Sequence, residues 1–300
     1  MRINYKNGNI IVEDVMDFDL GETLECGQCF RYDKIGNNDY IIVAMKRMLH
    51  ISQKGRILTF YNTSRQDYEE IWEDYFDLKR DYGKIKSILF EKDSKIKDAI
   101  MSQGGIRILN QEFDEVLMSF IISQNQQIPR IRKIISTICE RYGDQAGTYN
   151  GQVYYTFPDE KRLAAISEEE YRECKTGFRA SYLYGAAQAL ADGTINGEEL
   201  RKLSREEAEQ KLQQIRGVGK KVADCTLLFG LGFRAAFPID VWIKRIMEEL
   251  YFGKEVKKEA IQEYACTAFG EWGGYAQQYL FAYARENKSK NKKNEENKRK

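Results

Sequence analysis

Two adjacent lysines follow a short glycine turn in the stretch IRGVGKKVADCTLLFGL, residues 215–231. A lysine can act as a nucleophile when its amine is partly desolvated, because desolvation lowers the pKa of the ammonium group. Successive side chains on a helix diverge by about 100°, so Lys220 and Lys221 point in different directions. We expect Lys221 to share a face with Asp224 and Cys225, and Lys220 to point toward solvent or a phosphate. The pattern indicates a reactive amine, a pair of phosphate-binding cations or a plain solvated helix face.

The turn lies between two expected helices. Ser204 and Glu207 fit a capping box at the start of the first helix, and the second begins at Lys220. Gly217 and Gly219 permit positive φ and would let the backbone approach a ligand closely. Free amide groups at the start of the second helix favour an anion such as a DNA phosphate. The segment is typical of a helix-hairpin-helix, although a plain interhelical turn has the same pattern.

A carboxylate follows in the segment AFPIDVW, where Pro238 restricts the chain and Asp240 precedes another apolar helix. An aspartate at the mouth of the same cleft could stabilise positive charge on a substrate or hold it in position. Asp is also a preferred residue at a helix N-cap, and that interpretation is the simpler one from these residues alone. Both roles stay open at this stage.

The chain that positions these residues changes its apolar period near residue 62. Short β-branched or aromatic runs such as NIIVE and YIIVAMK predict an antiparallel sheet within residues 1–62. From about residue 66 the period is helical, and the domain boundary falls somewhere between 62 and 100. We expect an α+β architecture with a sheet domain over 1–98, a helical domain over 99–285 and a disordered basic tail over 286–300.

Composition narrows the class of protein. The chain has 300 residues, 42% of them hydrophobic, and a net charge of +1, which favours no particular partner. No apolar run is long enough to span a membrane and no export or organelle signal is visible, so we expect a soluble cytoplasmic protein with reduced thiols. Cys26 and Cys29 form a C-x-x-C motif, but its context favours neither redox chemistry nor zinc. Cys139, Cys174 and Cys266 are expected on apolar helix faces in the core.

Five motifs, in order along the chain, resemble one known family. They are CGQCFRY (26–32), FIISQNQQIPRI (120–131), GFRASYL (177–183), GVGKKVADCTLLFG followed by FPIDVW (217–242), and WGGYAQQYLF (272–281). The chain resembles the human-type 8-oxoguanine DNA glycosylases of the helix-hairpin-helix, glycine/proline-aspartate superfamily, up to about residue 286. The four-cysteine loop of the endonuclease III branch is absent, so no iron–sulfur cluster is expected.

The resemblance implies a monomeric, bifunctional enzyme of base-excision repair that acts on 8-oxoguanine in duplex DNA without an organic cofactor. The damaged nucleotide would be flipped out of the duplex. Lys221 would then attack the deoxyribose C1′, expel the base and form a Schiff base, and β-elimination would cleave the strand. Asp240 would stabilise the cationic sugar and orient the amine. No metal ligand is predicted, although carbonyls of the hairpin could hold an ion against a phosphate.

The resemblance also assigns residues to the extruded base. 8-Oxoguanine differs from guanine mainly by an added O8 and a proton on N7. The backbone carbonyl of Gly27 would accept a hydrogen bond from that proton, and a Cβ at this position would crowd the base. Cys225 and Phe281 would sandwich the base, and Gln277 would bond its Watson–Crick edge.

A second group of residues would contact DNA around the vacated position. Asn125 would fill the gap in the stack, Arg130 and Arg179 would donate to the orphaned cytosine, and Phe178 would form a wedge beside it. Gly217 and Gly219 would bring backbone amides to a phosphate. Trp242 stands where many relatives have His, so phosphate contact there must come from the indole N–H or from another residue.

Two rival functions remain open. A glycosylase for alkylated bases would keep the aspartate but generally lack the lysine, so Lys221 argues against it. A non-enzymatic helix-hairpin-helix module would need the glycine turn but neither a lysine–aspartate pair nor a base pocket. Capture of a covalent protein–DNA adduct would separate an enzyme from such a module.

Overall fold

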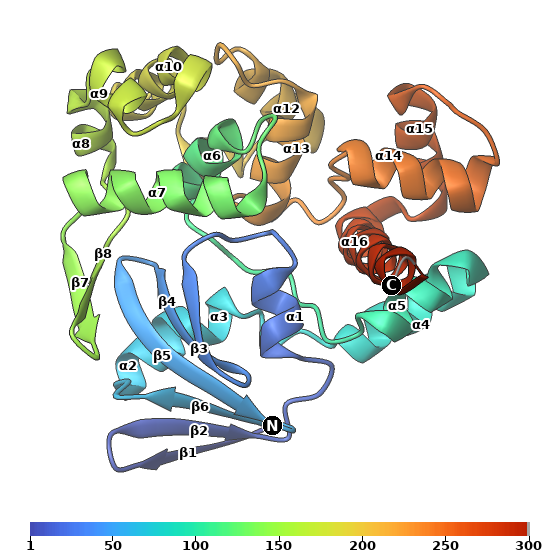
Figure 1. Cartoon of the computed structure of the whole chain (residues 1–300), viewed down its shortest axis with the longest axis horizontal. Coiled ribbons are helices and arrows are strands. Elements are labelled where there is room, and N and C mark those ends of the chain that lie inside the picture. Colours follow the sequence, from blue (N-terminus) through green and yellow to red (C-terminus); the bar gives the residue numbers. More distant parts are fainter. Residues whose placement is uncertain (299–300) are drawn as a thin grey trace.

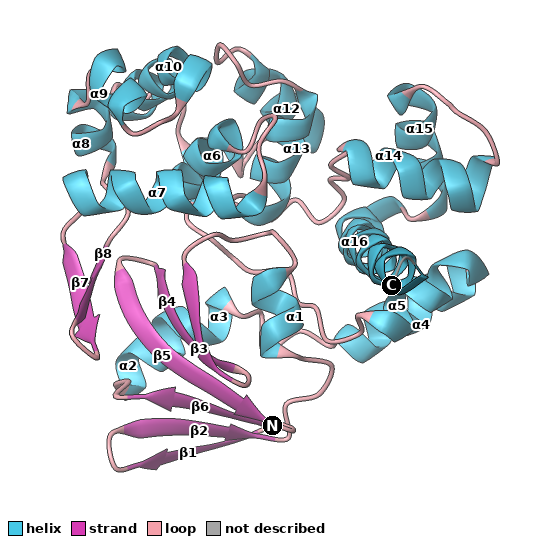
Figure 2. Cartoon of the chain, in the orientation of Figure 1, coloured by secondary structure: helices cyan, strands magenta, loops and turns pink. Residues whose placement is uncertain are grey.

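A computed structural model describes the backbone of residues 1–298 and the side chains of residues 1–286 (Figure 1). It contains an antiparallel sheet, a body of helices and a separate β-hairpin, which Figure 2 shows by colour. The sheet has the strand order β1-β2-β6-β5-β4-β3. Its strands are β1 (Arg2–Lys6), β2 (Asn9–Glu13), β3 (Tyr32–Gly36), β4 (Asp39–Ala44), β5 (Arg47–Lys54) and β6 (Ile57–Tyr61). The expected antiparallel N-terminal sheet is confirmed.

Alternation of side chains explains which face of the sheet is buried. Ile10 and Val12 on β2 pair with Phe60 and Leu58 on β6, and all four are buried. Residues two apart on a strand point to the same face, so these side chains form one apolar surface. The segment that follows β6 covers it, with Trp72 in the same core. The N-terminal sheet thus has a hydrophobic core of its own.

The helical body holds the second core. In Figure 1, α6 to α13 lie above the sheet, and α14 to α16 lie beside them with α4 and α5. The N-terminal helices are α1 (Leu20–Glu25), α2 (Arg65–Asp67), α3 (Glu73–Tyr75), α4 (Tyr82–Lys92) and α5 (Lys97–Ser102). The following ones are α6 (Phe113–Ile122), α7 (Ile128–Tyr142), α8 (Glu160–Ala165), α9 (Glu168–Glu173), α10 (Ala180–Ala191) and α11 (Gly197–Leu200). The last are α12 (Arg205–Gln213), α13 (Lys220–Phe229), α14 (Val241–Met247), α15 (Lys258–Ala268) and α16 (Gly273–Lys298).

The boundary between the two hydrophobic cores lies before residue 98, between Leu78 and Tyr82. Tyr82 on α4 packs edge to face against Tyr275 on α16, with ring centroids 5.5 Å apart. Leu89 and Ile100 belong to the same helical core, whereas Leu78 packs in the core of the sheet. The expected boundary at 98/99 falls inside α5. Because α4 and α5 bury their apolar sides against α16, they belong with the helical body.

Three elements differ from the sequence-based expectation. α1 interrupts the strand region, and the hairpin β7 (Gln145–Tyr149) and β8 (Gln152–Tyr155) interrupts the helices. The tail expected to be disordered over 286–300 continues the backbone of α16 up to Lys298, and its last two residues lie outside the described residues. Lys, Glu and Asn can extend an existing helix because the cost of nucleation falls on the buried part.

The cysteines follow the expectation with one exception. All six are free, and Cys139 and Cys174 are buried. Cys266 was expected in the core but is exposed. The buried face of α15 contains Ile261 and Ala265, and Cys266 lies one residue further, about 100° around the helix.

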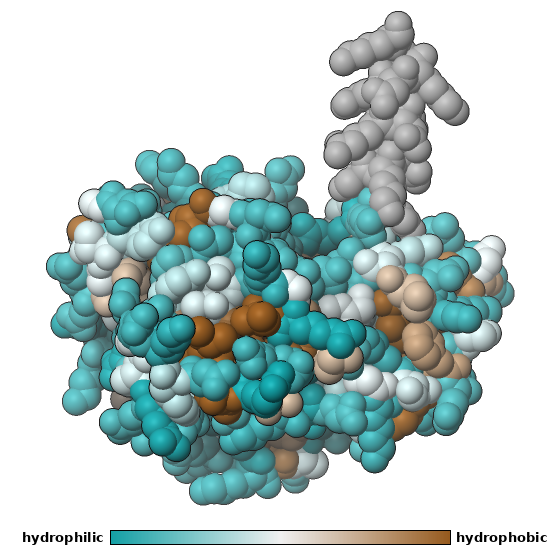
Figure 3. Space-filling model, turned by 90° about the horizontal axis from the view of Figure 1, so that it is seen from below, coloured by the Kyte–Doolittle hydropathy of each residue, from teal (hydrophilic) through white to brown (hydrophobic). Residues whose placement is uncertain are grey.

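The outer surface below the sheet is covered mainly by hydrophilic residues, with apolar ones in smaller groups (Figure 3). Across the described residues, no helix combines the length and the apolar character needed to cross a bilayer.

Candidate active site

The helix-hairpin-helix is formed by α12, a tight turn and α13. Ser204 and Glu207 make the predicted capping box at the start of α12. Gly217 has a φ of +89°, and a Cβ there would lie 2.2 Å from Cγ of Tyr182. Glycine is therefore required at 217 by both conformation and space. Gly219 does not use the positive φ that glycine permits: it is the N-cap of α13 with a φ of −90°.

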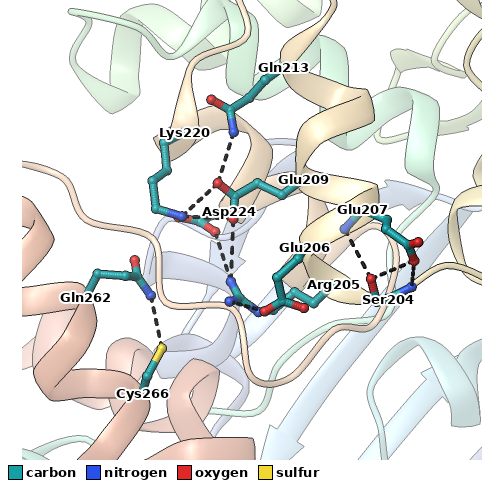
Figure 4. A network of polar contacts seen from close by, with 10 residues as sticks. All are labelled: Ser204, Arg205, Glu206, Glu207, Glu209, Gln213, Lys220, Asp224, Gln262 and Cys266. Atoms are coloured by element: carbon teal, nitrogen blue, oxygen red, sulfur yellow. Dashed lines mark hydrogen bonds and ion pairs between the residues drawn. The ribbon is translucent and has the colours of Figure 1, made fainter.

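The two lysines of the turn separate as expected, but with different partners. The ammonium group of Lys220 donates to both carboxylate oxygens of Glu209, at 2.8 and 2.9 Å, and lies 3.5 Å from Oδ2 of Asp224 (Figure 4). Asp224 thus faces Lys220, although it was expected to share a face with Lys221. A spacing of four residues aligns side chains more closely than a spacing of three. Lys220 is exposed, as expected, and also belongs to an ion-pair network that includes Asp224 and Arg205.

Lys221 points to the opposite side, into the helical body. Its Nζ donates to the Oγ atom of Ser123 at 3.1 Å and lies 4.7 Å from the centre of the Phe120 ring. The amine also contacts the thiol of Cys225, one turn further on α13. Burial raises the pKa of this thiol to about 12, so it stays protonated at neutral pH. The side chain of Lys221 is half-buried among these groups instead of extending into bulk water.

Asp240 begins α14, and its carboxylate acts as the N-cap. Oδ1 accepts hydrogen bonds from the amides of Trp242 and Ile243, both at 2.9 Å. Among the described residues, no donor bonds to Oδ2 and no ion pair joins Asp240 to Lys221. The structural role inferred from the sequence is therefore present. It leaves one carboxylate oxygen for other partners.

The lysine and the aspartate line one cavity of about 330 Å³, which is within the usual range for a small-ligand site. The cavity lies between the reading loop, defined here as residues 26–30 between α1 and β3, and helices α7, α13 and α16. All four residues that the resemblance assigns to the extruded base line the same cavity: Gly27, Cys225, Gln277 and Phe281. The structure thus brings together the two predicted catalytic residues and the predicted base contacts.

The reading loop is held from below by a buried glutamine. Gln28 Nε2 donates to the carbonyls of Thr23 and Arg107, at 2.9 and 2.7 Å, and Gln28 Oε1 accepts from the amide of Leu109. These bonds fix the chain on one side of Gly27, which has a φ of +94°. Burial also raises the pKa of the Cys26 thiol to about 11, which disfavours a thiolate for redox or metal chemistry.

Three of the residues predicted to contact DNA around the lesion lie in a hollow next to the cavity. Asn125, Arg130 and Trp242 line an adjoining hollow of about 710 Å³, together with Lys221 and Asp240. Asn125 has a φ of +50° in an exposed turn, and Arg130 is exposed. These three residues therefore reach the hollow from the loop before α7, from α7 and from α14.

Arg179 occupies a more buried place than its predicted role requires. Its guanidinium group donates to the carbonyls of Thr176, Gln124 and Asn125, and stacks over Phe178 at 4.3 Å. Arg179 therefore orders the turn that presents Asn125. Phe178 is 57% exposed, as expected for a side chain that contacts a partner.

Several side chains that line the cavity were not predicted from the sequence. Ser123 and Phe120 lie within a motif that was noted, but nothing in that motif predicted contact with Lys221. Gln278 and Arg285, both on α16, also line the cavity. The available signal was spacing: Gln277, Phe281 and Arg285 are four residues apart and so share one face of a helix.

Comparison with known proteins agrees with this arrangement. Residues 10–117 match the family model described as the N-terminal domain of 8-oxoguanine DNA glycosylase, and residues 118–269 match that of HhH-GPD superfamily base-excision DNA repair proteins. A probable N-glycosylase/DNA lyase of Methanothermobacter thermautotrophicus is 30% identical over 77% of this chain and 79% of its own length. An N-glycosylase/DNA lyase of Arabidopsis thaliana is 30% identical over 86% of this chain and 75% of its own length.

A solved structure extends the comparison to the coordinates. An 8-oxoguanine glycosylase/lyase of Clostridium acetobutylicum, in complex with double-stranded DNA containing cytosine opposite 8-oxoguanine, is 39% identical with a TM-score of 0.92. The similarity covers 96% of this chain and 99% of that one. The fold and the hairpin define a helix-hairpin-helix protein of base-excision DNA repair. Within this superfamily, the chain belongs to the 8-oxoguanine DNA glycosylase family, in which N-glycosylase and DNA lyase activities are combined.

Proposed function

We propose that this protein excises 8-oxoguanine from duplex DNA, opposite cytosine, and cleaves the resulting abasic strand by means of Lys221. One observation supports this most directly. The amine of Lys221, the carboxylate of Asp240 and the four side chains or peptides suited to a purine all line a single cavity. A module that merely holds DNA needs no such cavity.

The chemistry follows from the groups around the amine. After loss of a proton, the Lys221 amine attacks C1′ of the extruded nucleotide, and the N-glycosidic bond breaks with its electron pair going to the base. The developing positive charge on the sugar is stabilised by the carboxylate of Asp240, a residue that lines the same cavity. The resulting aminal opens to a Schiff base. Loss of a C2′ proton then expels the 3′ phosphate by β-elimination.

Recognition divides between the cavity and its mouth. The Gly27 carbonyl would accept from the N7 proton of the lesion, and Gln277 would bond the Watson–Crick edge between Cys225 and Phe281. At the mouth, Asn125 would fill the gap left in the duplex and Arg130 would donate to the orphaned cytosine. The turn between α12 and α13 would direct its amides to a phosphate. We propose that the enzyme works as a monomer in the cytoplasm, on nucleoid DNA.

Borohydride trapping tests this function. Reduction of the Schiff base should link the wild-type protein covalently to an 8-oxoguanine duplex. Lys221→Gln should abolish the adduct, whereas Lys220→Gln, one residue away and outside the cavity, should keep it. An undamaged duplex and a duplex with an alkylated purine serve as controls. An adduct that persists in Lys221→Gln would show that another amine is the nucleophile. The absence of any adduct with the wild type would contradict the proposed lyase activity.

A further inference from the structure

Arg285 connects the two walls of the cavity that would enclose the base. It lies on α16, one turn after Phe281, and its guanidinium group lies 5.6 Å from the centre of the Phe281 ring. From there Nη1 reaches across to the reading loop and donates to the carbonyls of Glu25 and Cys26, at 3.3 and 3.1 Å. One side chain thus contacts both an aromatic wall and the peptides that precede Gly27.

Gln278 makes a second connection between the same elements. The Cys26 thiol lies 3.5 Å from Oε1 of Gln278 and 3.2 Å from the carbonyl oxygen of Thr23, and its single proton can be donated to either acceptor. Nε2 of Gln278 donates to Oε1 of Gln277 at 2.7 Å, and Gln277 Nε2 in turn donates to the carbonyl of Pro238. Cys26 therefore contacts α16 through both its backbone and its side chain, while Gln28 holds the other side of Gly27.

These contacts of Arg285 and Gln278 with the reading loop matter because the backbone of Gly27 is conformationally free by itself. Its φ of +94° is accessible mainly to glycine, and a glycine peptide turns more easily than any other. A carbonyl distinguishes an N–H donor from a lone pair only if it cannot turn away from the lone pair. The nearest groups to a Cβ built on Gly27 include Ile128 at 3.3 Å and Nη1 of Arg285 at 3.4 Å, so the arginine also limits movement of the loop.

We propose that Arg285 is a positioning residue that fixes the Gly27 peptide against Phe281 and thereby sets the discrimination between 8-oxoguanine and guanine. This inference rests on the proposed function, because it needs the Gly27 carbonyl to read the base. Arg285 takes no part in the chemistry at C1′. Its loss should therefore affect recognition of a base and leave reactions at a site without a base unchanged.

The test compares Arg285→Met, which keeps an unbranched apolar stem but removes the donors, with Arg285→Lys, which keeps a cationic donor. In a Lys221→Gln background, dissociation constants are measured for duplexes with 8-oxoguanine or guanine opposite cytosine. Arg285→Met should lower the ratio of the two constants by roughly 10-fold, which corresponds to the loss of one well-placed hydrogen bond. Arg285→Lys should restore most of the ratio.

A second readout separates positioning from general damage. With Lys221 present, Arg285→Met should slow excision of 8-oxoguanine but cleave a preformed abasic site at a rate within about twofold of the wild type. An unchanged discrimination ratio, or an equal loss of excision and abasic-site cleavage, would overturn the proposal. If the wild type itself does not excise 8-oxoguanine, the proposed function fails instead, and the two failures are thereby distinguished.

Discussion

The two oxygens of the Asp240 carboxylate differ in their hydrogen bonds. Oδ1 accepts hydrogen bonds from two backbone amides at the start of α14, whereas Oδ2 has no hydrogen-bond donor among the described residues. The residue lines the cavity that Lys221 also lines. An asparagine could make the same backbone bonds through its carbonyl oxygen but would supply no charge. The structural and the proposed catalytic roles of this residue can therefore be separated by choice of substitution.

We expect Asp240→Asn to lower the rate of 8-oxoguanine excision by on the order of 100-fold, because a fixed charge near the transition state is lost. Its free energy of unfolding should stay within about 0.5 kcal/mol of the wild type. Asp240→Ala should lose activity and also about 1 kcal/mol of stability, because the cap is removed as well. Single-turnover excision and urea denaturation measure the two effects. Full activity of Asp240→Asn would contradict the charge role.

Sequence reasoning at this scale succeeded where the signal was local. The distinction between Lys220 and Lys221 required only the angle between neighbours on a helix, and the capping role of Asp240 required only its position. The contact between Lys221 and Ser123 joins residues 98 positions apart, and Arg285 reaches Cys26 across 259 positions. Such contacts depend on how whole elements pack, so no local pattern could predict them.

The hairpin of α12 and α13 contains a buried carboxylate whose charge state should affect its stability. Burial raises the pKa of Asp224 to about 7, while the neighbouring Lys220 opposes the shift. In the unfolded chain the same group titrates near 4. Between these values the folded state binds more protons than the unfolded state, so Asp224 makes the protein less stable as pH rises from about 4 to about 7.

Asp224→Asn should remove this dependence. Between pH 5 and pH 8 the wild type should lose more unfolding free energy than the variant, by on the order of 2 kcal/mol for a shift of this size. Asp14→Asn, which changes an exposed carboxylate of the sheet domain, is the matched control and should follow the wild type. Urea denaturation at both pH values measures the difference. Parallel curves for wild type and Asp224→Asn would show that the buried group does not titrate in this range.

Helices and turns could be predicted where a local sequence pattern indicates them. The helix-hairpin-helix follows from a capping box and a required glycine, both confirmed. The β7–β8 hairpin was missed although Asn150 and Gly151 both have positive φ, which is the Asn-Gly signature of a tight hairpin turn. α1 was missed because its six residues are too few to establish a helical period.

At the scale of the molecule, a buried ion pair joins the sheet domain to the helical body. Arg31, directly after the reading loop, donates to Glu115 on α6 at 2.9 Å, and both side chains are largely buried. Arg31 also donates to the carbonyl of Tyr155 on β8. Removal of one partner from such a pair leaves a charge buried without compensation.

We expect Arg31→Met to lower the free energy of unfolding by about 3 kcal/mol. Arg65→Ala, which breaks the exposed pair with Glu69 on the surface, should leave the free energy of unfolding almost unchanged, because solvent screens such a pair. Urea denaturation of the two variants under the same conditions provides the comparison. Equal, small effects would indicate that the two bodies are held together mainly by apolar packing.

The spacing of residues on α16 has a consequence for changes in chain length. Gln277, Phe281 and Arg285 face the cavity because they are one turn apart, and each successive residue is rotated by about 100°. Deletion or insertion of a single residue just before Gln277 would turn all three out of the cavity at once, while the helix itself could still form. The family should therefore tolerate substitutions along this helix far more readily than any shift of its frame.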